Sequence, residues 1–223
     1  MNPNEWISEL HWRTNNDYDT VIVIDGEEGS GKSNTGTQLA LRLDPTFDPD
    51  TTIYNHEDWA KRPAHKQKNV LLIDEGGDLG FSRDWNVLAN KELVKFMMVA
   101  RQLNQTMIFC IPNIYWLDKY FREHRTRYRL HMTGRSRAIV QKRNYDWRRN
   151  VLSFKDEFSF RPTNMKQARP DFWAAYLVRK RAALSHRPQR SGGASPTVEA
   201  ATPQADHPAG PSGSTPTAAA ASP

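Results

Sequence analysis

The run GEEGSGKS, residues 26–33, carries the clearest chemical signal in the sequence. It matches the pattern G-x-x-x-x-G-K-[S/T], in which backbone N–H groups and the N-terminus of the following helix bind phosphate groups. Lys32 is expected to reach the β- and γ-phosphates, and the Ser33 hydroxyl is expected to bind Mg²⁺. The sequence therefore predicts a site for a nucleoside triphosphate and Mg²⁺, formed by Gly26, Glu27, Glu28, Gly29, Ser30, Gly31, Lys32, Ser33 and Asn34.

Two glutamates, Glu27 and Glu28, stand inside this loop, where inward-facing carboxylates would repel the phosphates. Because such a loop binds phosphate through its backbone, side chains at these positions generally point outward. We expect both to be solvated. The alternative is that one of them meets an arginine or a metal-linked water at a boundary between subunits.

The run VLLIDE, residues 70–75, supplies the second half of the expected site. Its four apolar residues form a strand whose carboxyl end places Asp74 beside the phosphate-binding loop. Asp74 would hold Mg²⁺ through water, and Glu75 would polarise the attacking water as general base. Such a run is common by itself, and it gains weight because it follows a complete phosphate-binding loop.

Four further residues are candidates for roles near the reacting phosphate. Asn113 ends the run TMIFCIPN, where it is either a polar sensor beside the attacking water or a cap of the next helix. Arg122, then Arg125, then Arg101 are the candidates for an arginine finger that reaches the γ-phosphate of a neighbouring subunit. Each of the three, taken alone, is more often a surface arginine.

Basic residues are concentrated in the second half of the chain, although the net charge is only +6. Residues 1–118 hold 11 Lys and Arg against 18 Asp and Glu, whereas residues 119–190 hold 20 against 5. This asymmetry favours a polyanionic partner, nucleic acid first, over a solvated face or an anionic membrane. The candidate contacts are Arg127, Arg129, Arg135, Arg137, Lys142, Arg143, Arg148 and Arg149, with a secondary cluster at Arg179, Lys180 and Arg181.

The elements that must position these residues alternate between strands and helices. This alternation predicts a mostly parallel α/β sheet with helices on both faces and a C-terminal β-hairpin. Strands are expected at 20–25, 51–55, 70–73 and 106–111, and the hairpin at 127–143. Helices are expected at 32–43, 90–103, 114–124 and 170–184, with one helical turn near 6–11.

Composition divides the chain into four parts: a lead-in at 1–18, a nucleotide-binding core at 19–150, a basic helical extension at 151–190 and a disordered tail at 191–223. The tail has no aromatic or basic residue, so it cannot bury enough apolar area to offset its ordering entropy. No apolar run approaches the roughly 18–20 residues that span a bilayer. The single Cys110 excludes an internal disulfide framework and favours a reducing cytoplasm.

A strand expected at 51–55 and a glutamate after Asp74 resemble the ATPase division of P-loop proteins, which has an additional strand and a catalytic glutamate. Beyond that, DEGGDLGFSRDW, ARQLNQ and MIFCIPNIYWLDKYFREHR resemble the FtsK–HerA-like ATPases over about residues 18–145. The similarity is greatest to small viral packaging ATPases and zonular occludens toxin-like phage proteins. It implies a RecA-like core, ATP as the nucleotide and a ring, often a hexamer, that moves DNA. Such motors commonly carry Gln where this chain has Asn113.

Four functions follow from these features. The first is a Mg²⁺-dependent ATPase that packages double-stranded DNA into a capsid, acting in the host cytoplasm or on the virion, with a capsid or portal-vertex protein as a further partner. The second is a zonular occludens toxin-like ATPase of phage assembly or extrusion, a class that generally has a transmembrane segment. A helicase-loading switch and a nucleotide kinase are the others, and Glu75 argues against the kinase.

Overall fold

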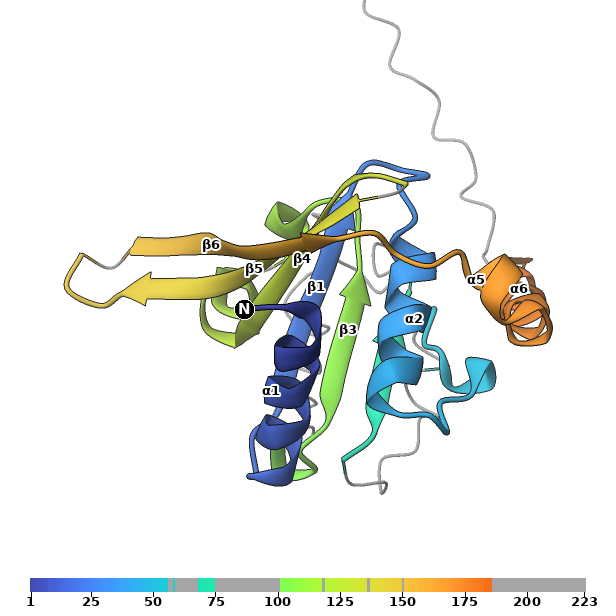
Figure 1. The fold of residues 1–223 in the computed structure, drawn as a ribbon, viewed down its shortest axis with the longest axis horizontal. Helices are drawn as coiled ribbons and strands as arrows, with labels where there is room; N and C mark the ends of the chain where they lie inside the picture. The colour runs from blue at the N-terminus through green and yellow to red at the C-terminus, as the bar shows by residue number, and fades with distance from the viewer. Residues whose placement is uncertain are drawn as a thin grey trace, which may run out of the picture. The chain divides into compact units, whose positions relative to one another are not determined.

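The computed structural model describes residues 1–55, 58, 68–74, 101–117, 119–135, 137–149 and 151–185. Met1–Arg187 form one compact unit built around a six-stranded sheet with the order β2-β3-β1-β4-β5-β6 (Figure 1). The expected Glu75, the glycine-rich loop after it, most of the helix expected at 90–103 and the tail lie outside the described residues. The strands are β1 (Thr20–Gly26), β2 (Val70–Ile73), β3 (Thr106–Cys110), β4 (Thr126–Gly134), β5 (Arg137–Asp146) and β6 (Val151–Phe160).

The first four strands of the sheet order are parallel, and the last two pairings are antiparallel. All residues of β1, β2 and β3 are buried. Such continuous apolar runs are typical of parallel strands that are covered on both faces. The mixed α/β architecture with a mostly parallel sheet therefore agrees with the expectation from sequence.

Alternation along the strands divides the core into two layers. Ile22 and Ile24 of β1 face a layer that is completed by α1 (Pro3–Asn15), α2 (Lys32–Leu43) and α6 (Pro170–Ser185). On the other face, the neighbouring valines of β1 pack with Ile111, Ile114, Leu117 and Phe121, from the segment after β3. Figure 1 shows α1 and α2 side by side against the sheet. Among the described residues, no helix has both the length and the apolarity needed to cross a bilayer.

Helix α2 packs unusually close to the sheet. A Cβ added at Gly36 would lie 2.8 Å from Cys110 Sγ and 2.9 Å from Leu72 Cδ1, which belong to β3 and β2. Any larger residue at this position would therefore push the helix away from the strands. Since α2 begins at Lys32, this contact also fixes the height of the phosphate-binding loop above the sheet.

Four segments differ from the expectation. Helix α1 spans 13 residues rather than one turn, because Asn2 and Glu5 form a capping box at its start. At 51–55 the structure has an isolated bridge between Ile53 and Ile73 in place of a full strand. The segment expected as a helix at 114–124 contains the short 3₁₀ helix η3 (Ile114–Trp116) and the π-helical turn η4 (Phe121–Arg125).

The fourth difference is β6, which lies where the sequence analysis placed the start of a helical extension. Leu152, Phe154, Phe158 and Phe160 supply an approximate two-residue period, and Phe158 and Phe160 pack against the core. A register shift between Val140 and Gln141 explains why the alternation is imperfect. The pairing of β6 with β5 overrides any helical tendency of this segment.

The two ends of the sheet carry different features. Because β4 runs parallel to β1, the turn between β4 and β5 lies at the same end as the phosphate-binding loop. Strand β5 runs back, so the turn between β5 and β6 lies at the opposite end. Figure 1 shows these two strands extending past β4 toward that turn.

Candidate nucleotide-binding site

Glycines with left-handed backbone shape the loop between β1 and α2. Gly29 has φ 73° and Gly31 has φ 95°, a region in which side chains are strained. Gly26 has φ 138°, and a Cβ there would stand 2.6 Å from the Met132 carbonyl oxygen of β4. Close packing against β4 thus explains the first glycine of the motif, and backbone conformation explains the other two.

Two groups of the loop can bind phosphate. Lys32 Nζ donates to the carbonyl oxygens of Gly26 at 2.8 Å and Glu27 at 2.7 Å, so its ammonium lies over the loop. The Ser30 hydroxyl is buried and has no hydrogen-bond partner within the described part of the chain. Buried polar groups are normally paired, so the unpaired Ser30 hydroxyl is consistent with a loop that binds an anion. The ammonium of Lys32, which lies over the same loop, is consistent with this as well.

Ser33 and Asp74 meet across the loop from different elements. Ser33 Oγ, at the start of α2, lies 3.0 Å from each carboxylate oxygen of Asp74, at the end of β2. A hydroxyl and a carboxylate are hard oxygen ligands of the kind that Mg²⁺ prefers. Ser33 and Asp74 therefore suit the Mg²⁺ ion expected from the sequence, and these two residues would hold it.

Helix α6 contributes two residues that the sequence analysis did not assign to this site. Lys180 Nζ lies 2.8 Å from Asp74 Oδ2 and 3.2 Å from Ser33 Oγ. The Tyr176 hydroxyl donates to the same Asp74 oxygen. Burial, and then the nearby Asp74 carboxylate, raise the pKa of Tyr176 well above its ordinary value, so this hydroxyl stays protonated and can donate.

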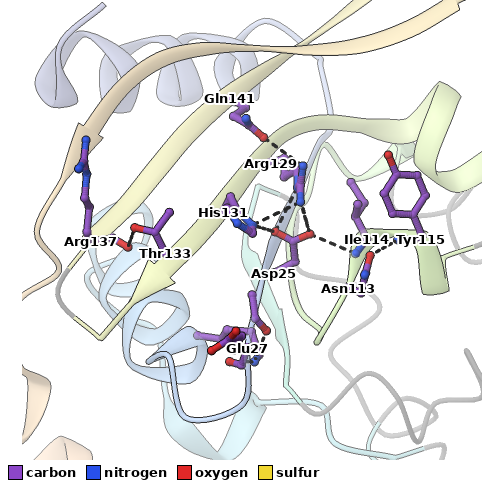
Figure 2. Close-up of polar contacts among 12 residues, drawn as sticks. Asp25, Glu27, Asn113, Ile114, Tyr115, Arg129, His131, Thr133, Arg137 and Gln141 are labelled. Atoms are coloured by element: carbon purple, nitrogen blue, oxygen red, sulfur yellow. Dashed lines mark hydrogen bonds and ion pairs between the residues drawn. The ribbon is translucent and has the colours of Figure 1, made fainter.

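A buried charge cluster lies immediately before the loop (Figure 2). Asp25 is 1% exposed, and its carboxylate accepts from Arg129 Nε at 3.0 and 3.1 Å. His131 Nδ1 lies 2.9 Å from the same carboxylate, and the Ile114 backbone N–H donates to it at 3.1 Å. Asp25 therefore ties the end of β1 to β4 and to the segment that follows β3. An acid ending a buried strand needs such partners, and this was the signal available in the sequence.

A cavity of about 540 Å³ lies between the loop and the β4–β5 turn. Glu27, Glu28 and Ser30 line one side, and His131 and Arg135 line the other. Arg135 Nε also donates to the Gly29 carbonyl oxygen at 3.0 Å. Both glutamates are exposed, as expected of solvated loop residues. The cavity adjoins β4, so it lies on the side of β1 opposite to Asp74.

The four residues proposed for roles near the reacting phosphate have the following positions in the structure. Asn113 is exposed, and its side chain accepts from the Tyr115 N–H at 2.9 Å, which is the capping geometry. Arg122 lies over the Tyr115 ring, and Arg125 pairs with Asp19. Arg101 and Arg125 stand just before the amino ends of β3 and β4, so both lie at the sheet end opposite the loop, whereas Arg122 contacts the segment that follows β3. A role on a neighbouring subunit stays a prediction for each.

Most of the expected nucleic-acid contacts are engaged within the chain. Arg127 and Lys142 pair with Glu9, and Arg143 donates to the Glu123 carbonyl oxygen. Arg129 and Arg135 hold Asp25 and the loop as described, while Arg179 pairs with Asp58 and Lys180 with Asp74. Within the described part of the chain, Arg137, Arg148 and Arg181 are exposed and form no ion pair, although Arg148 lies over the Trp147 ring. Arg149 is also exposed and forms a 3.8 Å pair with Asp146.

The glycine-rich loop, Lys32, Ser33 and Asp74 on this mostly parallel sheet are consistent with a P-loop NTPase-like fold. The family model described as "Zonular occludens toxin (Zot)" matches residues 28–169. The chain therefore belongs to the zonular occludens toxin family, a P-loop ATPase family related to phage packaging ATPases.

One solved structure with a similar chain is the N-terminal domain of zonular occludens toxin from Neisseria meningitidis. The two share 14% sequence identity with a TM-score of 0.40, and the match covers 61% of this chain and 93% of that one. No curated protein matches the sequence.

Proposed function

We propose that this chain is a Mg²⁺-dependent ATPase that powers phage assembly or extrusion. The observation that carries the proposal is the convergence of Ser33 and Asp74, whose oxygens lie 3.0 Å apart at the mouth of the phosphate-binding loop. Lys32 would bind the β- and γ-phosphates, and Ser33 and Asp74 would hold Mg²⁺, which supplies charge neutralisation of the phosphates when bound.

The sheet order supports the additional-strand, catalytic-glutamate type of P-loop ATPase. The strand between β1, which leads into the loop, and β2, which Asp74 follows, is β3. The segment 51–55, which was expected to be the additional strand, forms only the bridge between Ile53 and Ile73. In the sequence Glu75 follows Asp74, and we propose it as the base that takes a proton from the attacking water. Transfer to water rather than to a second substrate makes the reaction a hydrolysis.

The cavity beside the loop supports a site for the nucleoside. The metal-binding residues lie on one side of β1 and the cavity on the other. With the terminal phosphates held toward Asp74, the ribose and base would extend toward His131 and Arg135. A volume of about 540 Å³ is in the range of small-ligand pockets.

For the work that hydrolysis performs, we propose movement of double-stranded DNA by a ring of copies of this chain in the host cytoplasm. The exposed turn between β5 and β6 supports a DNA contact. Trp147 is 74% exposed there, and the Arg149 side chain is 83% exposed beside Arg148. Arginines can contact the phosphates of a duplex, and the exposed indole would stack on bases only if the DNA were single-stranded there. An alternative proposal is that the ring packages double-stranded DNA into a capsid, with a capsid or portal-vertex protein as partner.

The test is ATP hydrolysis by the full chain, measured with and without long double-stranded DNA, together with mass in solution. Lys32→Ala is expected to abolish hydrolysis, and Glu75→Gln is expected to bind ATP while turning over very slowly. Arg181→Ala, on the exposed side of α6, is the control, with normal turnover expected in the absence of DNA. Undiminished hydrolysis by Lys32→Ala refutes the site, and a monomer indifferent to DNA refutes the motor in favour of a kinase or switch.

A further inference from the structure

The ammonium of Lys180 contacts the two side chains expected to hold Mg²⁺, Ser33 and Asp74. It lies 2.8 Å from Asp74 Oδ2 and 3.2 Å from Ser33 Oγ. Both Lys180 and Asp74 are largely shielded, with side-chain exposures of 17% and 2%. A cation in this place competes with the metal, because an ammonium this close to both oxygens repels a divalent cation held by Ser33 and, through water, by Asp74.

Other contacts fix α6 in this position. Tyr176 lies one turn before Lys180, on the same face of the helix, and donates to the same carboxylate. Its ring stacks on Trp173 at a centroid distance of 4.9 Å. One residue before Lys180, Arg179 pairs with Asp58, whose other oxygen accepts from the Tyr54 N–H at 3.0 Å. The position of Lys180 is therefore set by the contacts of its helix, and not by the conformation of its own side chain alone.

A charge argument explains why a lysine is needed there. Asp74 accepts hydrogen bonds from Ser33 and Tyr176, but neither of these groups carries a positive charge, so a counter-charge stabilises this buried carboxylate whenever the metal is absent. Lys180 provides that charge in the metal-free protein. When Mg²⁺ enters with nucleotide, the same carboxylate has a divalent partner, and repulsion between the two cations favours release of the lysine.

We propose that Lys180 is the resident counter-cation of the metal site and that binding of ATP with Mg²⁺ displaces it, and with it the carboxyl-terminal half of α6. Helix α6 thereby sets the Mg²⁺ concentration at which the site loads. The proposal rests on the proposed nucleotide site, but its consequences differ from the loss of that site.

The experiment measures binding of a fluorescent, non-hydrolysable ATP analogue as Mg²⁺ is increased. Lys180→Met keeps the length of the side chain and removes its charge, so the half-saturating Mg²⁺ concentration is expected to fall by about threefold or more. Lys180→Arg keeps the charge and is expected to stay near the wild-type value. Arg181→Met changes an exposed neighbour on the same helix and is the control for a general loss of positive charge.

Two results overturn the proposal. The first is an unchanged Mg²⁺ dependence in Lys180→Met. The second is weaker binding of the ATP analogue by Lys180→Met, which would mean that Lys180 contacts the phosphates instead of competing with Mg²⁺. Failure of the proposed function has a separate signature, since wild-type protein would then bind no analogue at any Mg²⁺ concentration. If Lys180→Met does not fold, hydrogen exchange on the wild-type chain decides. Exchange in residues 176–184 is expected to rise with analogue and Mg²⁺ but not with analogue and chelator, and equal protection in both refutes the displacement.

Discussion

Replacing Asp25 by Asn tests whether the buried charge cluster holds the phosphate-binding loop in place. Asn keeps the size of the side chain and an oxygen for the Ile114 N–H, but it removes the charge that faces Arg129 and His131. Removing one partner of a buried ion pair typically costs about 3–5 kcal/mol. The Arg129 side chain is 20% exposed and that of His131 is 38% exposed, which favours the lower end, about 3 kcal/mol.

For a chain of this size, that loss corresponds to a fall in melting temperature of roughly 6–12 °C. Thermal unfolding and urea titration of Asp25→Asn measure it, and Asp146→Asn is the control. Asp146 is 43% exposed and faces an arginine that is 83% exposed, so its loss should cost about 0.5 kcal/mol or less. The double variant with Arg129→Gln should recover part of the cost. A cost for Asp25→Asn below about 1 kcal/mol, or strict additivity in the double variant, would refute the reasoning.

Three other predictions concern the loop, α6 and the far turn of the sheet. Gly26→Ala should cost several kcal/mol and abolish nucleotide binding, because its Cβ would stand 2.6 Å from the Met132 carbonyl oxygen. Gly134→Ala, where φ is 154° and the space is open, is the matched control, and equal losses would contradict the clash. Because burial raises the pKa of Tyr176 above 10.0, its contribution to stability should be complete below that pH and lost as pH rises through the folded-state pKa. Urea unfolding from pH 8 to 11 should show a shallower decline in Tyr176→Phe than in wild type, and parallel declines would count against it. Arg148→Ala with Arg149→Ala should weaken DNA binding and reduce its salt dependence while basal hydrolysis is retained, as a salt titration of DNA affinity would show. An unchanged salt slope would remove this turn from the DNA interface.

The predictable part of the site is local in sequence. The phosphate-binding loop is a contiguous motif, and the position of Asp74 follows from the rule that the carboxyl ends of parallel strands meet at one edge. The structure agrees by bringing Ser33 and Asp74 into contact. Lys180 could not be found in this way, because it is separated from Ser33 by 147 residues and was grouped with its basic neighbours instead.

Net charge along the sequence does not depend on pairing. Residues 119–190 carry the same total whether their arginines form an open basic surface or pair within the chain. Arg129 satisfies Asp25, and Lys142 satisfies Glu9, so these two side chains neutralise acids contributed by the first part of the sequence. Strand β6 was missed because the register shift beside Gln141 interrupts the two-residue period that identifies a strand.

Strand β6 has one more consequence, for the behaviour of the protein at high concentration. It ends the described sheet, so one row of its backbone N–H and C=O groups lacks a neighbouring strand in the described sheet. Such an edge can add a strand from a second molecule. The three consecutive charged residues Lys155, Asp156 and Glu157 lie in the middle of this edge, with the first two exposed. Their hydration opposes sheet growth from chain to chain, so the solubility of the protein depends on a segment remote from its nucleotide site.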